Sequence, residues 1–142
     1  MTKIADLLAG RPDRVWSVTS SQSVMDAINL MSEKNIGVVC VIDDENLLGI
    51  FSERDYARKM VMQNKSAEQT PLEDVMTRNV ISVTREDNIE RCMNLMSDHN
   101  FRHLPVTEEG RVVGMISITD IVKAIIKEQQ FTIEQLENYI AG

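Results

Sequence analysis

The stretch Gly49-Ile50-Phe51-Ser52-Glu53-Arg54-Asp55 decides how this chain folds, because it recurs 65 positions later as Gly114-Met115-Ile116-Ser117-Ile118-Thr119-Asp120. The repetition extends toward the N-terminus: residues 15–55, aligned without a gap on residues 80–120, give thirteen identical pairs. Average residue usage would supply roughly two or three by chance. A unit of this size buries little surface alone. We therefore expect two copies to pack as one domain with pseudo-twofold symmetry, and any site to occur twice.

Composition indicates a single globular domain. The 142 residues are 43% hydrophobic and 26% charged, and no apolar run approaches the ~18–20 residues of a transmembrane helix. The N-terminus has an early acid, Asp6, and only a short apolar stretch, which is typical neither of a secretory signal nor of an Arg-rich transit peptide. We expect no membrane association and a cytoplasmic location. The net charge of −7 argues against a nucleic-acid partner.

The cysteines and histidines do not form a recognisable metal or disulfide pattern. Cys40 sits in an apolar run and Cys92 on the apolar stripe of a predicted helix, and neither has a CxxC partner. Both are interpreted as small buried hydrophobes. With only His99 and His103 besides, no metal site is expected.

Hydrophobic periodicity predicts the order strand, helix, strand, strand, helix in each repeat. Ser23 and Asn88 are suitable N-caps for helices whose apolar residues recur at i, i+3, i+4 and i+7. Pro105 should lie at a strand edge or bulge, because it cannot donate to a ladder. The predicted hairpins pair residues 37–42 with 47–51 and 103–106 with 112–116.

Along the chain, residues 1–142 are divided into a first repeat (3–62), a polar linker (63–70), a second repeat (71–127) and a short C-terminal helix (128–142). Thr132-Ile133-Glu134-Gln135 has the form of a capping box, and Ile133, Leu136 and Ile140 would share one apolar face. That face must dock on something. Its own domain and a second subunit are both open.

The paired Ser-x-x-Asp segments carry the chemistry. A Ser and an Asp three residues apart at a helix start form a capping box, which is a purely structural use. The same geometry also suits a ligand, because free N–H groups and a hydroxyl bind an anion and a carboxylate accepts ribose hydroxyls. Two copies, each after a β-branched strand, favour the binding role. Capping and binding do not exclude each other.

The chain resembles a tandem pair of CBS domains (named after cystathionine β-synthase). The matching pieces are Asp74-Val75-Met76-Thr77, Arg102-His103-Leu104-Pro105-Val106 and the two Gly-x-x-Ser-x-x-Asp segments. Residues 53–59, 101–106 and 129–136 resemble small stand-alone CBS-pair proteins of bacteria and organelles. The resemblance implies an α/β module of two β-α-β-β-α repeats that binds adenine nucleotides, AMP foremost and otherwise ADP, ATP or NAD(H), and that forms homodimers.

The resemblance also implies two clefts, in each of which Asp would hold the ribose and Ser the phosphate. The first cleft would use Ser52, Arg54 and Asp55, with Val80 and Ile81 beside adenine and Arg102 and His103 near phosphate. The second would use Ser117, Thr119 and Asp120, with Val15 and Trp16 beside adenine and Ile36, Gly37 and Val38 completing the wall.

The basic residues differ between the clefts: Arg54 is matched by Thr119, and Arg102 by Gly37. Because Arg binds phosphate bidentately, the Ser52/Asp55 cleft should prefer ligands with more phosphate charge, and the Ser117/Asp120 cleft should tolerate AMP or a less charged adenine ligand. Arg58 and Lys59 reach either phosphate or a dimer partner, or form a solvated helix face, and the last interpretation is favoured.

These features favour a non-enzymatic adenine-nucleotide sensor acting through a dimer or through a regulated partner that the sequence does not identify. The alternative is an interaction scaffold with vestigial clefts. An enzyme is disfavoured, because no Walker lysine motif, metal cluster or nucleophile–base pair is present.

Overall fold

A computed structural model describes residues 2–142. Its first repeat has the predicted strand-helix-strand-strand-helix order, whereas the predicted first strand of the second repeat is reduced to one parallel bridge between Val83 and Val106. The elements are α1 (Ile4–Leu8), β1 (Ser17–Val18), α2 (Val24–Lys34), β2 (Val38–Asp43), β3 (Asn46–Ser52), α3 (Glu53–Asp55), a π-helix η1 (Tyr56–Val61), a 3-10 turn η2 (Leu72–Asp74), α4 (Ile89–His99), β4 (His103–Glu108), β5 (Arg111–Ser117) and α5 (Ile118–Ala141).

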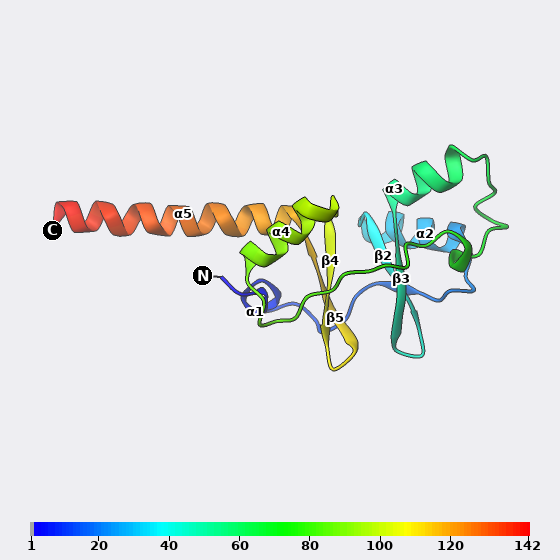
Figure 1. Ribbon diagram of the computed structural model, residues 1–142, viewed down its shortest axis with the longest axis horizontal. Helices are drawn as coiled ribbons and strands as arrows, with labels where there is room; N and C mark the ends of the chain where they lie inside the picture. The colour runs from blue at the N-terminus through cyan, green and yellow to red at the C-terminus, as the bar shows by residue number, and fades with distance from the viewer. Residues whose placement is uncertain (1) are drawn as a thin grey trace.

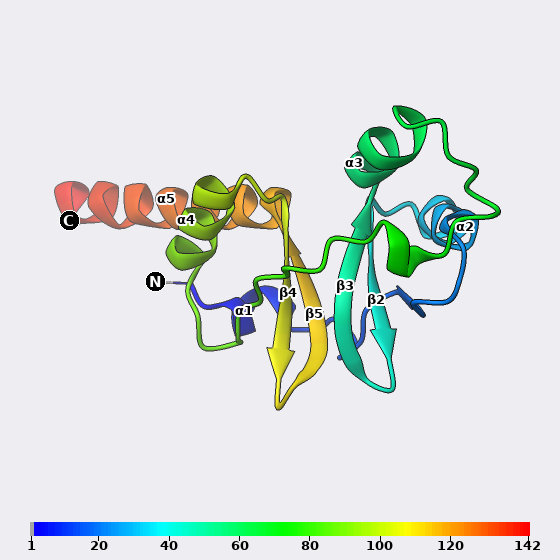
Figure 2. The ribbon, with the colours of Figure 1, turned by 45° about the vertical axis from the view of Figure 1, so that its right-hand side comes forward.

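Two small sheets carry the repeats. The first has the order β1-β2-β3, with β1 parallel to β2 and β2 antiparallel to β3; the second is the β4-β5 hairpin. Both hairpins break register at matching places, after Val41 and after Val106. Pro105 lies in β4 next to that irregularity, which confirms its predicted position. Figures 1 and 2 show the two hairpins side by side in the middle of the molecule.

The predicted helix caps are present. The Ser23 hydroxyl accepts the backbone N–H of Asp26 at 3.2 Å, and the Asn88 amide oxygen accepts that of Arg91 at 2.9 Å. Both α2 and α4 end on an asparagine in the left-handed region, Asn35 at φ 53° and Asn100 at φ 58°. Asparagine tolerates this conformation better than most residues, so the matched caps hold both helices to the same length.

The leading segment of each repeat packs on the other repeat. Ile4 and Leu8 of α1 belong to the core of the second repeat, whereas Leu72 of η2 and Met76, just after η2, belong to the core of the first. Figure 2 shows α1 beside β4 and β5. Because each core is completed by a segment from the other repeat, the two repeats form one interlocked unit.

The glycine that recurs in β3 and β5, as Gly49 and Gly114, is explained by this exchange of segments. A Cβ at Gly49 would lie 2.6 Å from the Thr77 carbonyl oxygen, and one at Gly114 would lie 2.7 Å from a Leu8 methyl group. Each glycine therefore allows the crossing segment to approach the strand closely.

The C-terminal helix is part of α5. The sequence predicts a separate short helix from residue 128, but one helix runs unbroken from Ile118 to Ala141. The expected break is wrong because no Gly or Pro interrupts the run, and the Thr132 hydroxyl donates to the Glu128 carbonyl within the helix instead of capping a new one. Cys40 and Cys92 are both buried, as predicted. Among residues 2–142, no helix is long and apolar enough to cross a bilayer.

Candidate functional site

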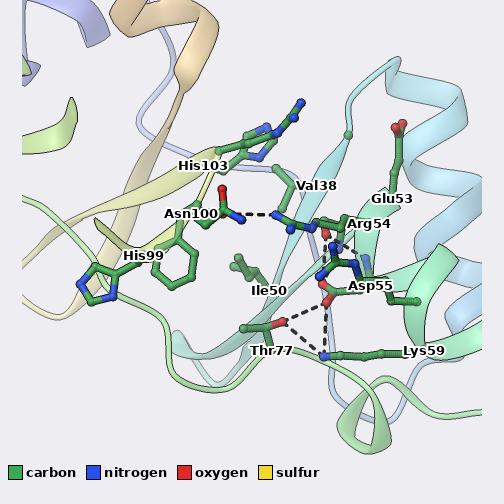
Figure 3. A pocket seen from close by; sticks show the side chains of 15 residues that line it. Val38, Ile50, Glu53, Arg54, Asp55, Lys59, Thr77, His99, Asn100 and His103 are labelled. Atoms are coloured by element: carbon green, nitrogen blue, oxygen red, sulfur yellow. Dashed lines mark hydrogen bonds and ion pairs between the residues drawn. The ribbon is translucent and has the colours of Figure 1, made fainter. Parts of the chain in front are cut away.

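A cleft of about 880 Å³ lies where the two repeats meet, at the start of α3. Figure 3 shows side chains from both repeats turned toward it. The first repeat supplies the end of β3, α3 and the first turn of η1, and the second supplies the α4–β4 junction. The lining residues are Gly37, Val38, Ile50, Ser52, Glu53, Arg54, Asp55, Arg58, Lys59, Thr77, His99, Asn100, Phe101, Arg102 and His103.

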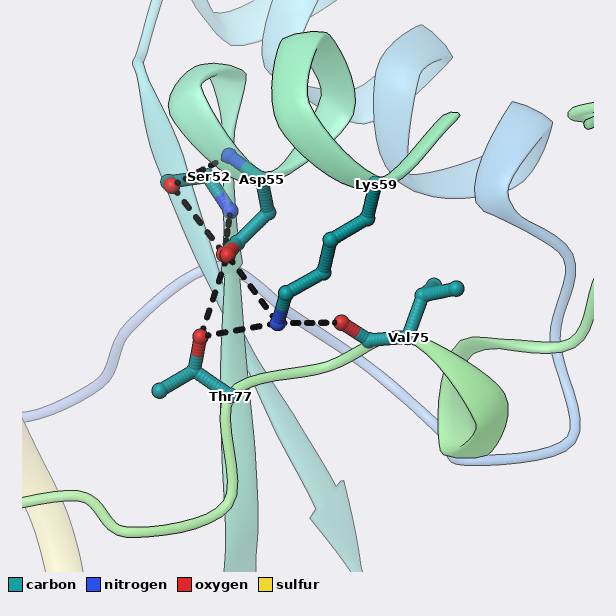
Figure 4. A network of polar contacts seen from close by, with 5 residues as sticks. All are labelled: Ser52, Asp55, Lys59, Val75 and Thr77. Atoms are coloured by element: carbon teal, nitrogen blue, oxygen red, sulfur yellow. Dashed lines mark hydrogen bonds and ion pairs between the residues drawn. The ribbon is translucent and has the colours of Figure 1, made fainter. Parts of the chain in front are cut away.

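The Asp55 carboxylate is the best-held acidic group of the cleft (Figure 4). Its Oδ2 accepts the Ser52 backbone N–H at 3.0 Å and the Ser52 hydroxyl at 3.1 Å. Its Oδ1 accepts the Thr77 hydroxyl at 3.0 Å and lies 3.3 Å from the Lys59 ammonium. These four donors fill the roughly four acceptor positions of a carboxylate. A ligand hydroxyl therefore binds Asp55 only by displacing one of them.

Ser52 and Asp55 also form the capping box that the spacing predicts, since the Asp55 backbone N–H donates to the Ser52 hydroxyl at 3.2 Å. Capping and cleft lining thus coexist. The helix then widens into η1, a π-helical segment, a feature that is frequent at functional sites. Within it, Lys59 turns back and donates to the Val75 carbonyl at 2.8 Å, which fixes its ammonium beside Asp55.

The cleft is locally cationic although the whole chain carries −7. Its permanent cations are Arg54, Arg58, Lys59 and Arg102, against the two carboxylates of Glu53 and Asp55. Arg54 already crosses between the repeats, donating to the Asn100 carbonyl at 3.2 Å. Such a cluster attracts anions locally.

His103 lies between the two Ser/Asp segments. It pairs with Ser117 across the β4–β5 hairpin. Burial lowers its pKa below the ordinary value, and nearby Arg102 acts in the same direction, whereas Asp120 and Glu53 oppose this. The imidazole is therefore neutral near pH 7 and is available as a hydrogen-bonding group.

The structure brings most of the first predicted set together and leaves part of it out. Ser52, Arg54, Asp55, Arg102 and His103 all line the cleft. Val80 and Ile81, predicted beside adenine, do not; Ile81 packs against the core of the second repeat. Their binding roles stay predictions.

The residues of the second predicted set have different environments, and their binding roles stay predictions. Gly37 and Val38, expected in its wall, line the Ser52/Asp55 cleft, where the Gly37 carbonyl accepts the Glu53 backbone N–H at 3.1 Å and holds β2 beside α3. Ile36 packs against the core of the first repeat. Thr119 is exposed and Val15 half-buried. Trp16 is 44% exposed and lies under the Lys34 ammonium, 4.4 Å from its ring centroid.

Ser117 and Asp120 form the predicted capping box of α5. The Asp120 carboxylate is also bound from outside the repeat motif: the Arg11 guanidinium donates to Oδ1 at 3.0 Å. Partial burial raises the pKa of Asp120, but hydrogen bonds from the Ser117 backbone N–H and from Arg11 outweigh it and hold that pKa below the ordinary value. An arginine thus occupies the carboxylate where a second ribose would bind.

Sequence reasoning missed several lining residues. Arg58 and Lys59 both line the cleft. Lys59 is half-buried and bonded to Asp55 and Val75, so the solvated-face interpretation is wrong for it, whereas Arg58 is exposed. Thr77 was visible as the last residue of the Asp74-Val75-Met76-Thr77 motif, and its 22-residue separation from Asp55 concealed the contact. His99, Asn100 and Phe101 adjoin the Arg102-His103 motif. Asn100 was the residue that could have indicated this part of the cleft, because as the C-cap it ends α4 and leads the chain directly into the cleft wall.

Comparison with known proteins agrees with this architecture. The family model described as "CBS domain" matches residues 11–61 and 72–127. The chain belongs to the CBS family. Its two repeats are the two halves of a CBS pair. Among curated proteins, it is 35% identical to the mitochondrial CBS domain-containing protein CBSX3 of Arabidopsis thaliana, over 99% of this chain and 73% of that protein. Since that relative is mitochondrial, the cytoplasmic location stays a prediction.

Solved structures give the same family. A CBS-domain protein of Burkholderia ambifaria, described as acting in signal transduction, is 44% identical with a TM-score of 0.85, covering 93% of this chain and 99% of its own. The CBS domain pair of protein MJ0100, solved in complex with 5′-methylthioadenosine and S-adenosyl-L-methionine, is 29% identical with a TM-score of 0.79, covering 90% of this chain and 98% of its own.

Proposed function

We propose that this CBS pair is a non-enzymatic regulatory module that binds an adenine nucleotide in the Ser52/Asp55 cleft, with AMP, ADP, ATP and NAD(H) as the candidates. One observation carries the proposal: a buried carboxylate at a helix start faces a cationic cleft of about 880 Å³ between the repeats. Pockets of about 300–1,000 Å³ suit small molecules.

Each part of a nucleotide has a matching group. Ribose hydroxyls would replace the Thr77 and Ser52 hydroxyls on Asp55. The displaced Ser52 hydroxyl would then donate to phosphate, together with Arg54 and Arg102. Val38, Ile50 and Phe101 offer apolar surface for the purine. After this exchange the Thr77 hydroxyl would keep the Lys59 ammonium, 3.4 Å away, as a partner.

The ligands of the MJ0100 pair support the adenosine part of this proposal. 5′-Methylthioadenosine and S-adenosyl-L-methionine both carry adenosine and neither carries phosphate. In this chain, the phosphate preference rests on Arg54, Arg58 and Arg102, the exposed guanidinium groups of the cleft. Adenosine, AMP and ATP should therefore bind in increasing order of affinity.

The test is calorimetric titration of these three ligands and of 5′-methylthioadenosine into wild type and Asp55→Asn, after mass spectrometry of small molecules released from the purified protein. Asp55→Asn should weaken AMP binding by about tenfold or more, since a bond to a charged group contributes about 1.5–3 kcal/mol. Asp26→Asn is the matched control, because Asp26 closes the same capping box on α2 away from the cleft.

Equal losses in both variants would assign Asp55 to helix capping alone. If none of these ligands binds wild type, the scaffold alternative replaces the proposal. Bound ATP should be recovered unchanged after long incubation, and its turnover by pure protein would contradict a non-enzymatic role.

A further inference from the structure

The C-terminal half of α5 makes little contact with the rest of the chain. Every residue from 129 to 142 is exposed, and Figure 1 shows this part of the helix extending away from α4 and the sheets. This segment carries large apolar side chains that are 48–84% exposed. A contiguous exposed apolar surface indicates an interaction site.

A straight line of exposed side chains runs along α5. Its members alternate in spacing of four and three residues, which is the a/d pattern of a coiled coil. The apolar members are between 47% and 83% exposed. They are Val122, Ile126, Ile133, Leu136 and Ile140, with Gln129 completing the alternation. The line lies beside the face that docks on the chain's own core through Ile121 and Ala124, so the two faces serve different contacts.

We propose that this line is the seam of an antiparallel two-stranded coiled coil with α5 of a second copy of this chain. Ile126, Ile133 and Ile140 occupy the a positions, and Leu136 and Val122 occupy d positions. Such a seam is self-complementary, so a twofold axis near residue 131 closes it into a dimer.

The flanking charges favour the antiparallel direction. With the axis near residue 131, Lys123 lies opposite the partner's Glu137, and this ion pair forms twice. In a parallel pair, Lys123 and the partner's Glu137 would be two heptads apart. Gln129 would then face its own copy across the seam rather than an isoleucine.

The length of the helix fits this register. The seam from Val122 to Ile140 spans 19 residues, about 28 Å at 1.5 Å per residue. The partner's Ile140 then lies opposite Val122, five residues after the end of β5. Each helix would therefore end where the body of the other copy begins, and the seam would be covered over its whole length.

The test combines analytical ultracentrifugation with cross-linking of the full chain. Wild type should sediment as a dimer and Leu136→Asp as a monomer, whereas Gln135→Asp, on the same exposed helix but off the seam, should stay dimeric. Lys123→Glu and Glu137→Lys should each weaken the dimer several-fold. The double variant should restore it, because the pair is reversed on both sides.

Cysteine pairing tests the direction independently. A mixture of Val122→Cys and Ile140→Cys proteins should form mixed disulfides, whereas neither protein alone should cross-link. A monomeric wild type, a dimer indifferent to Leu136→Asp, no rescue by the charge swap, or self-cross-linking of Val122→Cys would each overturn the proposal. None of these readouts depends on nucleotide binding, so they are independent of the proposed function.

Discussion

The Arg11 guanidinium donates a 3.0 Å hydrogen bond to Oδ1 of Asp120, and a second donor of the same group lies 3.4 Å from the Met115 carbonyl oxygen. In the first cleft the cation beside the carboxylate is Lys59, whose ammonium lies 3.3 Å from Oδ1 of Asp55. The two Ser/Asp anchors are therefore alike in sequence and held by different partners. An arginine from the start of the chain pairs with the second anchor, whereas a lysine one turn further along the helix pairs with the first.

Replacing Arg11 should make the second anchor available. Arg11→Met removes the donor on Asp120, so the pKa of that carboxyl should rise toward its ordinary value and a second, weaker nucleotide should bind per chain. Carbon-13 NMR of the carboxyl and calorimetric stoichiometry would measure both. Arg111→Met is the control, because Arg111 forms an exposed ion pair with Glu45 away from both anchors. An unchanged stoichiometry would show that Arg11 does not block a site.

The guanidinium groups should set the ligand charge preference. Arg54→Ala and Arg102→Ala should each weaken ATP binding by about tenfold, the lower limit for losing a bond to a charged group, and should change adenosine binding little. Thr119→Ala, at the position equivalent to Arg54, should leave ATP binding unchanged. Titrations of ATP and adenosine measure this. Parallel losses of both ligands would mean that the arginines shape the cleft rather than bind phosphate.

Ligand affinity should depend on the protonation of His103. The pKa of His103 is lower in the folded protein than its ordinary value, so protonation of His103 destabilises the fold. The stability contributed by the neutral imidazole is fully present above about pH 6.5 and is lost as the pH falls through the depressed pKa. A bound phosphate favours the imidazolium, so the affinity for ATP should increase as the pH is lowered from about 8 to about 5. His103→Gln should reduce this dependence. Adenosine, which carries no phosphate, provides the baseline; the same pH profile for adenosine would exclude a His103–phosphate contact.

The two repeated glycines should differ in their tolerance of alanine. At Gly49 the added Cβ meets a backbone oxygen at 2.6 Å, whereas at Gly114 it meets a side chain at 2.7 Å. A leucine methyl can rotate away and a backbone carbonyl cannot. Gly49→Ala should therefore lower the free energy of unfolding by about 1–3 kcal/mol, the range for overpacking, and Gly114→Ala by less. Urea unfolding compares them, and a reversed order would refute the reasoning.

Both cysteines should be unreactive in the folded protein. Burial raises the pKa of Cys40 to about 12 and, with a smaller contribution from Asp87, that of Cys92 to about 11. The thiolate is the reactive form. A thiol reagent such as dithionitrobenzoate should label neither at neutral pH and both in urea. Fast labelling without denaturant would show that a core opens locally.

Local features of the fold could be predicted from the sequence because their causes lie within a few residues. The helix caps at Ser23 and Asn88 depend on a side chain and an N–H group three positions apart. The hairpin positions follow from β-branched runs and turn residues. The capping boxes at Ser52 and Ser117 have the same local origin, so they were recognisable without knowing what lies around them.

Other features were decided by packing across the chain. The predicted break before Thr132 was wrong because a capping-box pattern is equally compatible with a helix interior when no Gly or Pro stops the helix. Gly37 and Val38, predicted for the second cleft, also line the first, because α3 packs on the end of β2 and holds both residues beside it. Spacing along the chain does not contain either relationship.

The duplicated sequence by itself determined that this protein is a pair of similar α/β units, each with a Ser and an Asp at a helix start. The tertiary structure decided which partners hold each of the two anchors. Thr77 and Lys59 reach Asp55, and Arg11 reaches Asp120 from 109 residues away. The physical reason is that a carboxylate's partners depend on distance in space, whereas a repeat specifies only distance along the chain.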